Sequence, residues 1–362
     1  MRILLFGEFS GLFTCLKEGL ETLGHEVVTA SDGNGYKNYP RDLDWYVDPN
    51  SKLGRLRHFA ELKKIYDFRN KLKGFDVVYI IHPQLFSRYV WAIRPVYEYL
   101  IKNNKKVFIC GAGSTAVMVN YWLNSGEKYQ NYVEGNLRDM PNLKNTYSRQ
   151  SLINWEYELL SRVNGFIPIW YEYAQPFRNH PKRIQTVRIP INIQKIEYKP
   201  NVVSDKIVFF HGLSTRKEAK GTRYIQEAFV RMERKYGDVA AFHCAGGLPF
   251  NEYMELIGKT NVILDDANSY SIAMNGLFSL AKGKLVMGGA ESIANKELGF
   301  AESENPVFNL CPDVNQICSQ IEYIIENKDH IEEWGLKGRQ FVERYHDYRD
   351  IAEQYIEIFE KY

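Results

Sequence analysis

Residues 206–222 read KIVFFHGLSTRKEAKGT and predict a buried strand, a glycine-bearing turn and the start of a helix. The run 207–210 is apolar and β-rich, as the strands of a covered parallel sheet are. Arg216 and Lys220 stand four residues apart, just before or within the helix start. Two cations there oppose the helix dipole unless an anion lies between them and the N-terminal amides. A diphosphate fits this place, because Arg offers a fork and Lys a point charge; a solvated basic helix start is the alternative.

The alternation of short apolar runs and helices continues on both sides of this stretch. In the second half it predicts strands at 240–244, 261–264 and 285–287 and helices at 221–236, 251–258 and 273–281. In the first half it predicts strands at 2–6, 25–30, 76–81 and 106–110 and helices at 12–23 and 89–103. Such alternation forms βαβ units, so the expected fold class is α/β with two doubly wound parallel sheets.

Two domains are expected, because 362 residues are more than one hydrophobic core usually serves. The segment 186–204 holds Pro190 and Pro200 and little periodicity, which is typical of a linker. Two doubly wound domains that face one another make a cleft at their strand ends, the usual ligand position in such sheets. The expected domains cover residues 1–190 and 191–345, followed by a closing helix over 346–362.

Composition places the chain among globular cytoplasmic proteins. Hydrophobic residues make up 45% and charged residues 25%, which excludes disordered and fibrous classes. No stretch approaches 18 apolar residues, so no membrane span is expected, and the apolar run after Arg2 is too short for a signal-peptide core. The five cysteines are scattered without a CxxC pair, which argues against both a disulfide framework and a structural zinc site.

Charge is distributed unevenly along the chain. Residues 1–200 hold 28 Lys and Arg against 19 Asp and Glu, a net +9, and residues 201–362 hold 18 against 25, a net −7. The stretch 52–73 holds eight basic residues against two acidic ones, with apolar residues at helical spacing. A basic amphipathic helix can lie on an anionic membrane, and an ordinary surface helix with a solvated face is the alternative. No nucleic-acid partner is expected.

Two features of the first half are candidates for ligand contact. The turn Gly7–Gly11 joins the first strand to the first helix, where backbone N–H groups can approach a phosphate or sugar oxygen; a simple tight turn is the alternative. The turn is not GxGxxG, and only Asp32 could serve a nicotinamide ribose. His82 follows a strand and faces the expected cleft, and a structural hydrogen-bonding role is its alternative.

Further segments complete an ordered set that covers nearly the whole chain. They are Gly7 with Gly24-His25-Glu26-Val27, Ile81-His82, Ile189-Pro190-Ile191-Asn192, Gly212 with Arg216 and Lys220-Gly221, Asp265-Asp266 with 269–275, 281–286, and the closing helices 328–362. This set resembles the GT-B glycosyltransferases, in particular glycosyltransferase family 4, which includes sucrose, mannosyl and capsular-polysaccharide transferases. The resemblance implies two Rossmann-like domains with a cleft between them and a C-terminal helix that crosses back to the N-terminal domain.

The resemblance also implies roles for particular residues. Arg216 and Lys220 would bind the donor's diphosphate and stabilise its departure, and His82 would contact the transferred sugar; these three are the expected catalytic residues. The turn 271–273 would present amides to the phosphate and sugar. The expected donor-binding residues are Gly7, Gly11, Gly212, Arg216, Lys220, Tyr270, Ser271, Ile272, Ala273 and Asn275.

The sequence departs from the family at one motif. Family members usually carry a Glu, seven residues and a second Glu, which contact the donor sugar and the ribose hydroxyls. Here Tyr270 and Phe278 take those positions, so both carboxylates are absent. Asp265, Asp266 or Glu291 could compensate, Tyr270 could stack on sugar or base, and an inactive member of the family is an alternative.

The expected function is therefore transfer of a sugar from a nucleoside-diphosphate sugar to a glycan or lipid-linked acceptor in cell-surface polysaccharide synthesis. The resemblance implies retention of anomeric configuration, no metal and no cofactor besides the sugar donor. The enzyme is expected in the cytoplasm or peripherally on the inner face of the membrane. Two alternatives stay open: a sugar-nucleotide epimerase of the same fold, whose acid–base chemistry needs paired carboxylates, and a non-catalytic subunit.

Overall fold

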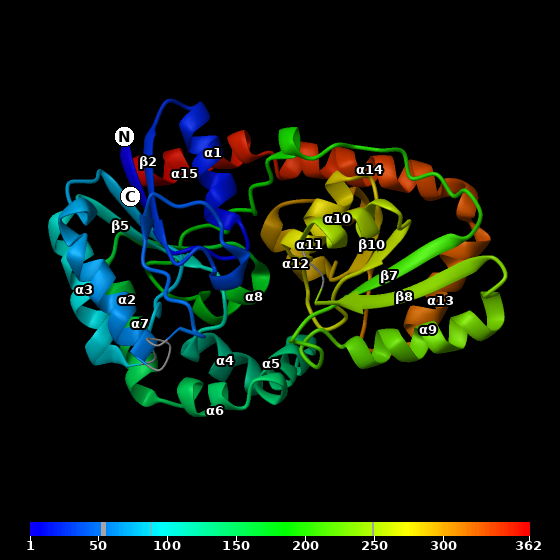
Figure 1. The fold of residues 1–362 in the computed structure, drawn as a ribbon, viewed down its shortest axis with the longest axis horizontal. Helices are drawn as coiled ribbons and strands as arrows, with labels where there is room; N and C mark the ends of the chain where they lie inside the picture. The colour runs from blue at the N-terminus through cyan, green and yellow to red at the C-terminus, as the bar shows by residue number, and fades with distance from the viewer. Residues whose placement is uncertain (52–55, 88, 248–249) are drawn as a thin grey trace. The chain divides into compact units, whose positions relative to one another are not determined.

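The computed structural model describes residues 1–51, 56–87, 89–247 and 250–362, which form two compact units of an α/β fold (Figure 1). The predicted basic stretch is described only from residue 56 onward, and its residues 52–55 lie outside the described ranges. Unit 1 comprises Met1–Tyr121, Asn145–Asn192 and Tyr348–Tyr362. Unit 2 comprises Trp122–Lys144 and Ile193–Asp347.

Unit 1 is built on a six-stranded parallel sheet in the order β3-β2-β1-β4-β5-β6. Its inner strands are almost wholly buried, because helices cover both faces of a parallel sheet. The strands are β1 (Arg2–Phe6), β2 (Glu26–Ser31), β3 (Leu43–Asp44), β4 (Val77–Ile80), β5 (Lys106–Gly111) and β6 (Gly165–Pro168). The helices are α1 (Leu12–Thr22), α2 (Arg57–Asp67), α3 (Val90–Asn103), α7 (Gln150–Arg162), α8 (Tyr171–Ala174) and α15 (Tyr348–Lys361), with short 3-10 turns at Gly35–Lys37, Arg69–Leu72 and Gln175–Phe177. Two further helices, α4 (Ala116–Leu123) and α6 (Asn142–Tyr147), contain the points where the chain passes between units.

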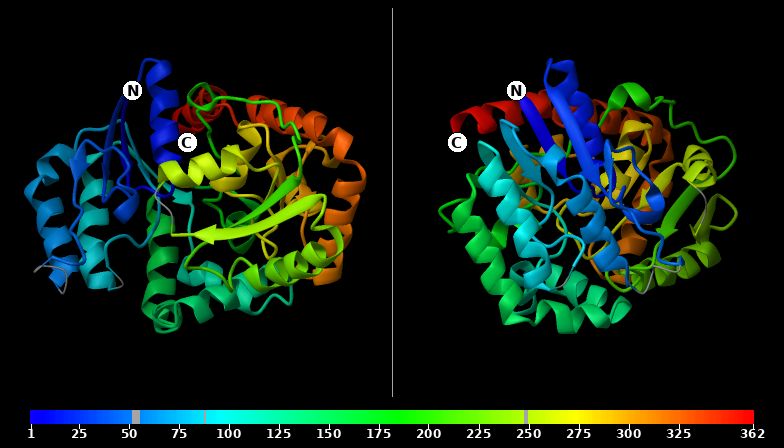
Figure 2. Two further views of the ribbon diagram at one scale, coloured as in Figure 1. Left: turned by 45° about the vertical axis from the view of Figure 1, so that its right-hand side comes forward. Right: turned by 60° about the vertical axis from the view of Figure 1, so that its left-hand side comes forward.

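The C-terminal helix α15 packs against α1, and the two lie side by side in Figures 1 and 2. The contact is close because Gly19 of α1 has no side chain: a Cβ there would lie 2.2 Å from the Tyr348 carbonyl oxygen. Deeper in the unit, the Tyr355 hydroxyl lies 3.2 Å from that of Tyr79 on β4. The C-terminal helix therefore belongs to the N-terminal unit, which confirms that part of the predicted fold.

Unit 2 is built on a five-stranded parallel sheet in the order β11-β10-β9-β7-β8. The strands are β7 (Ile207–Leu213), β8 (Ala240–Gly246), β9 (Val262–Leu264), β10 (Leu285–Gly288) and β11 (Phe308–Asn309). The helices are α5 (Lys128–Asp139), α9 (Thr222–Tyr236), α10 (Phe250–Gly258), α11 (Met274–Ala281), α12 (Ser292–Leu298), α13 (Val314–Glu326) and α14 (Ile331–Tyr345), with 3-10 turns at Ile193–Lys195, Glu302–Glu304 and Lys328–His330.

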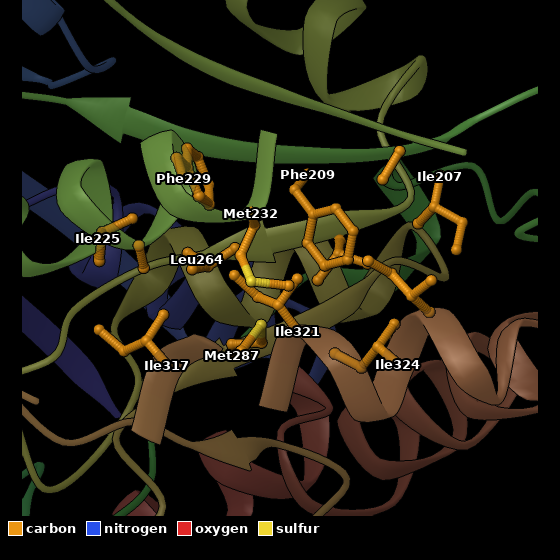
Figure 3. Close-up of a cluster of buried hydrophobic side chains, with 14 of the residues drawn as sticks. Ile207, Phe209, Ile225, Phe229, Met232, Leu264, Met287, Ile317, Ile321 and Ile324 are labelled. Atoms are coloured by element: carbon orange, nitrogen blue, oxygen red, sulfur yellow. The ribbon is translucent and has the colours of Figure 1, made fainter. Parts of the chain in front are cut away.

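The core of unit 2 lies between its sheet and the helices α9 and α13 (Figure 3). The apolar residues of α9 and α13 recur at helical spacing and pack on the strands, so these helices shield one face of the sheet from solvent. The buried side chains that meet there include Phe209, Ile225, Phe229, Met232, Leu264, Met287, Ile317 and Ile321. This packing fixes the strands whose carboxyl ends carry the predicted donor-binding residues.

One segment groups differently from the expected domains. Residues 122–144, including α5, precede the linker in sequence yet form part of unit 2. Nothing in the local sequence pattern assigns a helix to one sheet or the other, since that choice depends on contacts far along the chain.

Candidate functional site

The loop 214–221 joins β7 to α9 and carries both predicted diphosphate-binding cations. Its main chain is held from within unit 2, because the Asn268 side-chain amide donates to the carbonyl oxygens of Glu218 and Ala219 at 3.3 and 2.7 Å. Gly221 closes the loop at φ +68°, and a Cβ there would lie 3.2 Å from the Ala267 side chain. A glycine is therefore required where the loop enters α9.

Lys220 forms an ion pair with Asp265, at the carboxyl end of β9. The ammonium lies 2.9 Å from the Asp265 Oδ1, which also accepts from the Asn275 amide at 3.3 Å. Burial of Asp265 favours the neutral acid, but the charge and hydrogen bond of Lys220 outweigh it and hold the pKa of that carboxyl below its usual value. The structure thus brings Lys220 and Asn275 together around a carboxylate that sequence reasoning named only as a possible substitute.

The neighbouring carboxyl of Asp266 shifts in the opposite direction. Burial raises the pKa of Asp266 to about 6, and the adjacent charge of Asp265 adds to that rise. His211 lies close to the pair, and burial lowers the pKa of His211 to about 4. The His211 Nδ1 lies 2.9 Å from the Leu264 carbonyl oxygen, and its Nε2 lies 2.9 Å from the Thr222 hydroxyl.

Arg216 is exposed and lies beside α5. Its guanidinium Nη1 is 3.4 Å from the hydroxyl of Tyr132, one of the α5 residues. Of the two predicted cations, Arg216 therefore presents its charge at the surface of unit 2, while the charge of Lys220 is balanced by Asp265.

Helix α5 packs directly on the loop 214–221. A Cβ at Gly135 would lie 2.4 Å from the Glu218 carbonyl carbon and 2.5 Å from the Ala219 nitrogen, so only glycine allows this approach. At the end of the helix, the carboxylate of Asp139 accepts from the main-chain N–H groups of Glu218 and Ala219 at 3.1 and 3.0 Å. The contacts of Gly135 and Asp139 hold the loop against α5, and neither contact was predicted from the sequence.

The predicted sugar-binding turn lies between β9 and α11. Tyr270, Ser271 and Ile272 are buried, and Ala273 is the residue before the first turn of α11. The turn packs on the end of β10, where a Cβ at Gly289 would lie 2.6 Å from both the Ser269 carbonyl oxygen and the Ser271 nitrogen.

The position of the first missing carboxylate is occupied by a buried ring. Trp122 and Tyr129 flank the Tyr270 ring at centroid distances of 5.9 and 6.4 Å. The Tyr270 hydroxyl donates to the exposed carboxylate of Glu127, at the start of α5, over 2.9 Å. Glu291 is engaged elsewhere, because its carboxylate pairs with Lys128 at 2.7 Å. The carboxylate that accompanies the turn is therefore Glu127, which sequence reasoning did not identify.

In unit 1, the turn Gly7–Gly11 is closed by its own Glu8. The Glu8 carboxylate accepts from the Gly11 N–H at 3.0 Å and from the Thr14 N–H at 2.9 Å. Gly7 and Gly11 adopt φ values of +97° and +88°, and a Cβ on Gly7 would lie 2.3 Å from Ile81. The amides at the start of α1 are thus satisfied within the protein, so their contact with a donor stays a prediction.

His82 lies just beyond β4 and is buried, with both ring nitrogens near the main chain. Its Nδ1 accepts from the Gln84 N–H at 3.0 Å, and its Nε2 lies 3.1 Å from the Ser114 carbonyl oxygen. Burial lowers the pKa of His82, which favours the neutral ring. A contact between His82 and a sugar stays a prediction, and it would require one of these hydrogen bonds to be exchanged.

The part of the chain that the structure describes holds a further cavity and neither a metal cluster nor a membrane-spanning helix. No group of three or more His, Cys, Asp or Glu side chains there could hold a metal ion. No helix among those described residues is long and apolar enough to cross a membrane. A pocket of about 440 Å³ in unit 1 is lined by residues that include Tyr157, Phe177 and His180, and none of the predicted site residues lines it.

Comparison with solved structures identifies the fold. No family model and no curated protein matches the sequence. Sucrose-phosphate synthase from Thermosynechococcus elongatus is similar over 100% of this chain and 98% of its own, with a TM-score of 0.64 and 14% identity. Anabaena HepE, solved with UDP and glucose, is similar over 100% of both chains (TM-score 0.63, 12% identity), as is UDP-GlcNAc 2-epimerase from Neisseria meningitidis, solved with UDP-GlcNAc (0.55, 12%). The two parallel sheets match those of these GT-B neighbours, so the predicted fold class is confirmed.

Proposed function

We propose that this protein is a glycosyltransferase that takes a sugar from a nucleoside-diphosphate sugar. The observation that carries the proposal is the loop 214–221, which places an exposed guanidinium and a paired lysine at the carboxyl end of a parallel strand. Ligands of open α/β sheets bind at that edge. Two proteins of the same architecture support the choice of donor, since HepE was solved with UDP-glucose and UDP-GlcNAc 2-epimerase with UDP-GlcNAc.

In the proposed reaction, negative charge develops on the departing diphosphate. Arg216 would bind it through its fork, and Lys220 would join once the phosphate competes with Asp265 for its ammonium. Both cations would then stabilise the transition state electrostatically. Retention of configuration, independence of metal ions and a glycan or lipid-linked acceptor in polysaccharide synthesis are parts of the proposal that rest on the family resemblance.

Direct assay of donor turnover tests the proposal. The purified protein is incubated with a panel of UDP-, GDP- and ADP-sugars, with and without a polyprenyl-phosphate or oligosaccharide acceptor, and released nucleotide is measured. Arg216→Ala and Lys220→Ala are each expected to lower turnover by about 100-fold, the usual effect of removing one preorganised electrostatic contact.

Arg223→Ala is the matched control, because this exposed cation at the start of α9 contacts the neighbouring Tyr224 and lies outside the loop 214–221. It should leave turnover unchanged. If no donor releases nucleotide and calorimetry detects no nucleotide binding, the result would instead support the non-catalytic alternative.

A second candidate is a sugar-nucleotide epimerase, which the buried pair Asp265 and Asp266 favours. Opposite pKa shifts on adjacent carboxyls are a feature of acid–base sites, because one group stays ionised while the other can hold a proton. Incubation with UDP-GlcNAc in the absence of acceptor separates the candidates. Formation of a C2 epimer that Asp266→Asn abolishes would favour the epimerase, and its absence alongside acceptor-dependent release of UDP would favour the transferase.

A further inference from the structure

Helix α2 and the start of α3, with the residue that precedes each, place large apolar side chains outward on unit 1. Trp91, Tyr66 and Phe59 are 63%, 62% and 59% exposed. Among the described residues, fourteen large hydrophobic side chains are exposed, and five of them belong to this region: Leu56, Phe59, Tyr66, Tyr89 and Trp91. We name these five side chains the aromatic patch. Such a concentration marks an interaction surface rather than scattered exposure.

Three members of the aromatic patch are in direct ring contact. The rings of Phe59 and Trp91 have centroids 6.3 Å apart, and Tyr89 stacks on Trp91 at 6.2 Å. Tyr66 lies two helical turns beyond Phe59 and therefore on the same face of α2. One chain of ring contacts thus links α2 to the start of α3, which lie together in Figure 1.

Helix α2 departs from the pattern of an ordinary surface helix, because a carboxylate is buried and two aromatic rings are exposed. Its buried positions are Glu61 and Ile65, so a carboxylate points inward, where it pairs with Arg57. Its outward face carries Phe59 and Tyr66, which are apolar. A helix that only met water would be expected to place its large apolar residues toward the core.

Cations surround the aromatic patch. Residues 57–73 hold six Lys and Arg against two acidic residues, a net +4. Arg69 lies over the Tyr66 ring at 3.7 Å, and Arg149 lies over the Tyr89 ring at 5.0 Å. Lys71 and Lys73 follow on the exposed side of the 3-10 turn. The partner that complements this surface is therefore both anionic and able to accept aromatic rings.

We propose that the aromatic patch and its cations dock unit 1 on an anionic lipid bilayer. Tyr and Trp rings concentrate at the membrane–water interface, since one part of each ring is apolar and another polar. Basic side chains at the same level are attracted by acidic headgroups, and apolar insertion and charge together give stable peripheral binding. The proposal adds residues of α3 and Arg149 to the basic stretch recognised in the sequence. It stands independently of the proposed reaction, although a docked enzyme would meet a lipid-linked acceptor in the bilayer surface.

Vesicle binding tests the proposal with the full chain. The protein is sedimented with vesicles of phosphatidylcholine alone and of phosphatidylcholine mixed with phosphatidylglycerol. Binding is expected only to the mixed vesicles and should weaken with added salt. Lys71→Gln/Lys73→Gln should lower the affinity about 25-fold, because each cation near an acidic surface contributes a factor of about five. Phe59→Ser/Trp91→Ser should reduce binding to the level seen with neutral vesicles.

Fluorescence supplies a second measurement that does not depend on the folding of those variants. Trp91 is the one exposed Trp among the described residues, so lipid-dependent blue shift and quenching by brominated lipid should come from it. Trp91→Phe should bind vesicles nearly as well as the unchanged protein but lose both signals.

The controls are Val230→Ser and Lys328→Gln, which alter an exposed apolar residue and an exposed cation of unit 2. Both should bind vesicles as the unchanged protein does. Equal binding to neutral and acidic vesicles, or full binding by Phe59→Ser/Trp91→Ser, would overturn the proposal. So would a dimer in solution that the same double substitution dissociates while no vesicle is bound, since the patch would then belong to a second copy of the chain.

Discussion

Asp139 accepts a hydrogen bond from the main-chain N–H of Ala219 over 3.0 Å, although the two residues are 80 positions apart in the chain. The same carboxylate accepts from the Glu218 N–H. A charged acceptor on two adjacent amides forms stronger hydrogen bonds than a neutral one. The conformation of the loop that carries Arg216 and Lys220 therefore depends on the end of α5.

Replacing this carboxylate should loosen the loop. Asp139→Asn keeps the shape but removes the charge and one of the two acceptor oxygens, so we expect nucleotide affinity to fall about tenfold, equivalent to losing one charge-assisted hydrogen bond of about 1.4 kcal/mol. Calorimetry with UDP measures the change. The matched control is Asp313→Asn, because Asp313 accepts from two amides at the start of α13, away from the loop. Both variants should melt at slightly lower temperature, and equal loss of UDP binding in the control would refute a specific role for Asp139.

Adding a methyl group at Gly135 should push α5 away from the loop. Gly135→Ala places a carbon within 2.5 Å of the Ala219 nitrogen, so the helix must shift. Overpacking of this kind typically costs about 1–3 kcal/mol of stability. We expect a lower melting temperature together with weaker UDP binding. Gly258→Ala provides the comparison, since a Cβ there meets no atom within 4 Å. A Gly135→Ala protein as stable as the Gly258→Ala protein would show that the close approach is not needed.

Breaking the pair between Lys220 and Asp265 should destabilise unit 2. Lys220→Met leaves the buried Asp265 carboxylate without its cation, which costs about 3 kcal/mol, the lower end for a broken buried pair because Lys220 is partly exposed. Lys220→Met/Asp265→Asn removes the charge as well and should recover most of that loss. Denaturant unfolding of Lys220→Met, Asp265→Asn and the double variant gives the coupling energy between the two side chains. Additive losses would mean that the two side chains do not interact energetically.

Stability should decrease as pH rises from about 4.5 to 7 because of Glu156. Burial raises the pKa of this α7 carboxyl to about 7 from an ordinary 4.5, and its Oε2 accepts from the Val117 N–H at 2.8 Å. Between these values the unfolded chain releases the proton while the folded protein keeps it, so unfolding becomes easier by about 3 kcal/mol. Above pH 7 Glu156 is ionised in both the folded and the unfolded state, so its contribution to the pH dependence of stability ends.

Melting temperature followed from pH 4 to pH 8 checks this expectation. Glu156→Gln keeps an acceptor for Val117 and should flatten the profile, with a gain in stability at the alkaline end. Glu158→Gln is the control, because hydrogen bonding to Arg94 lowers the pKa of Glu158. An unchanged slope in Glu156→Gln would assign the pH dependence to another group.

The fold could be predicted from sequence to the level of its architecture. Parallel strands are short apolar runs, and β1, β4 and β7 lie where those runs predicted them. Arg216 and Lys220 were likewise found at the end of β7, since that position follows directly from the strand and the helix beside it. These features depend on local sequence and on rules for the ends of strands.

The partners of those residues could not be predicted, because they come from distant parts of the chain. Asp265 lies 45 residues from Lys220, and Asp139 lies 79 residues from Glu218. Glu127 was missed for the same reason, as no pattern links it to Tyr270. Glu8 is different: a carboxylate within a glycine-bearing turn, three residues before Gly11, is a local signal that the first amides of α1 are already satisfied.

The packing of α15 on unit 1 has a consequence for the order in which the protein matures on the ribosome. Unit 2 is complete once Asp347 has emerged, whereas unit 1 still lacks the helix that covers α1 and meets Tyr79. Domains usually finish folding in the order of synthesis, N-terminal first. Here the unit that is translated first is the last to be completed, and until α15 emerges the apolar surface that this helix covers stays exposed on the nascent chain.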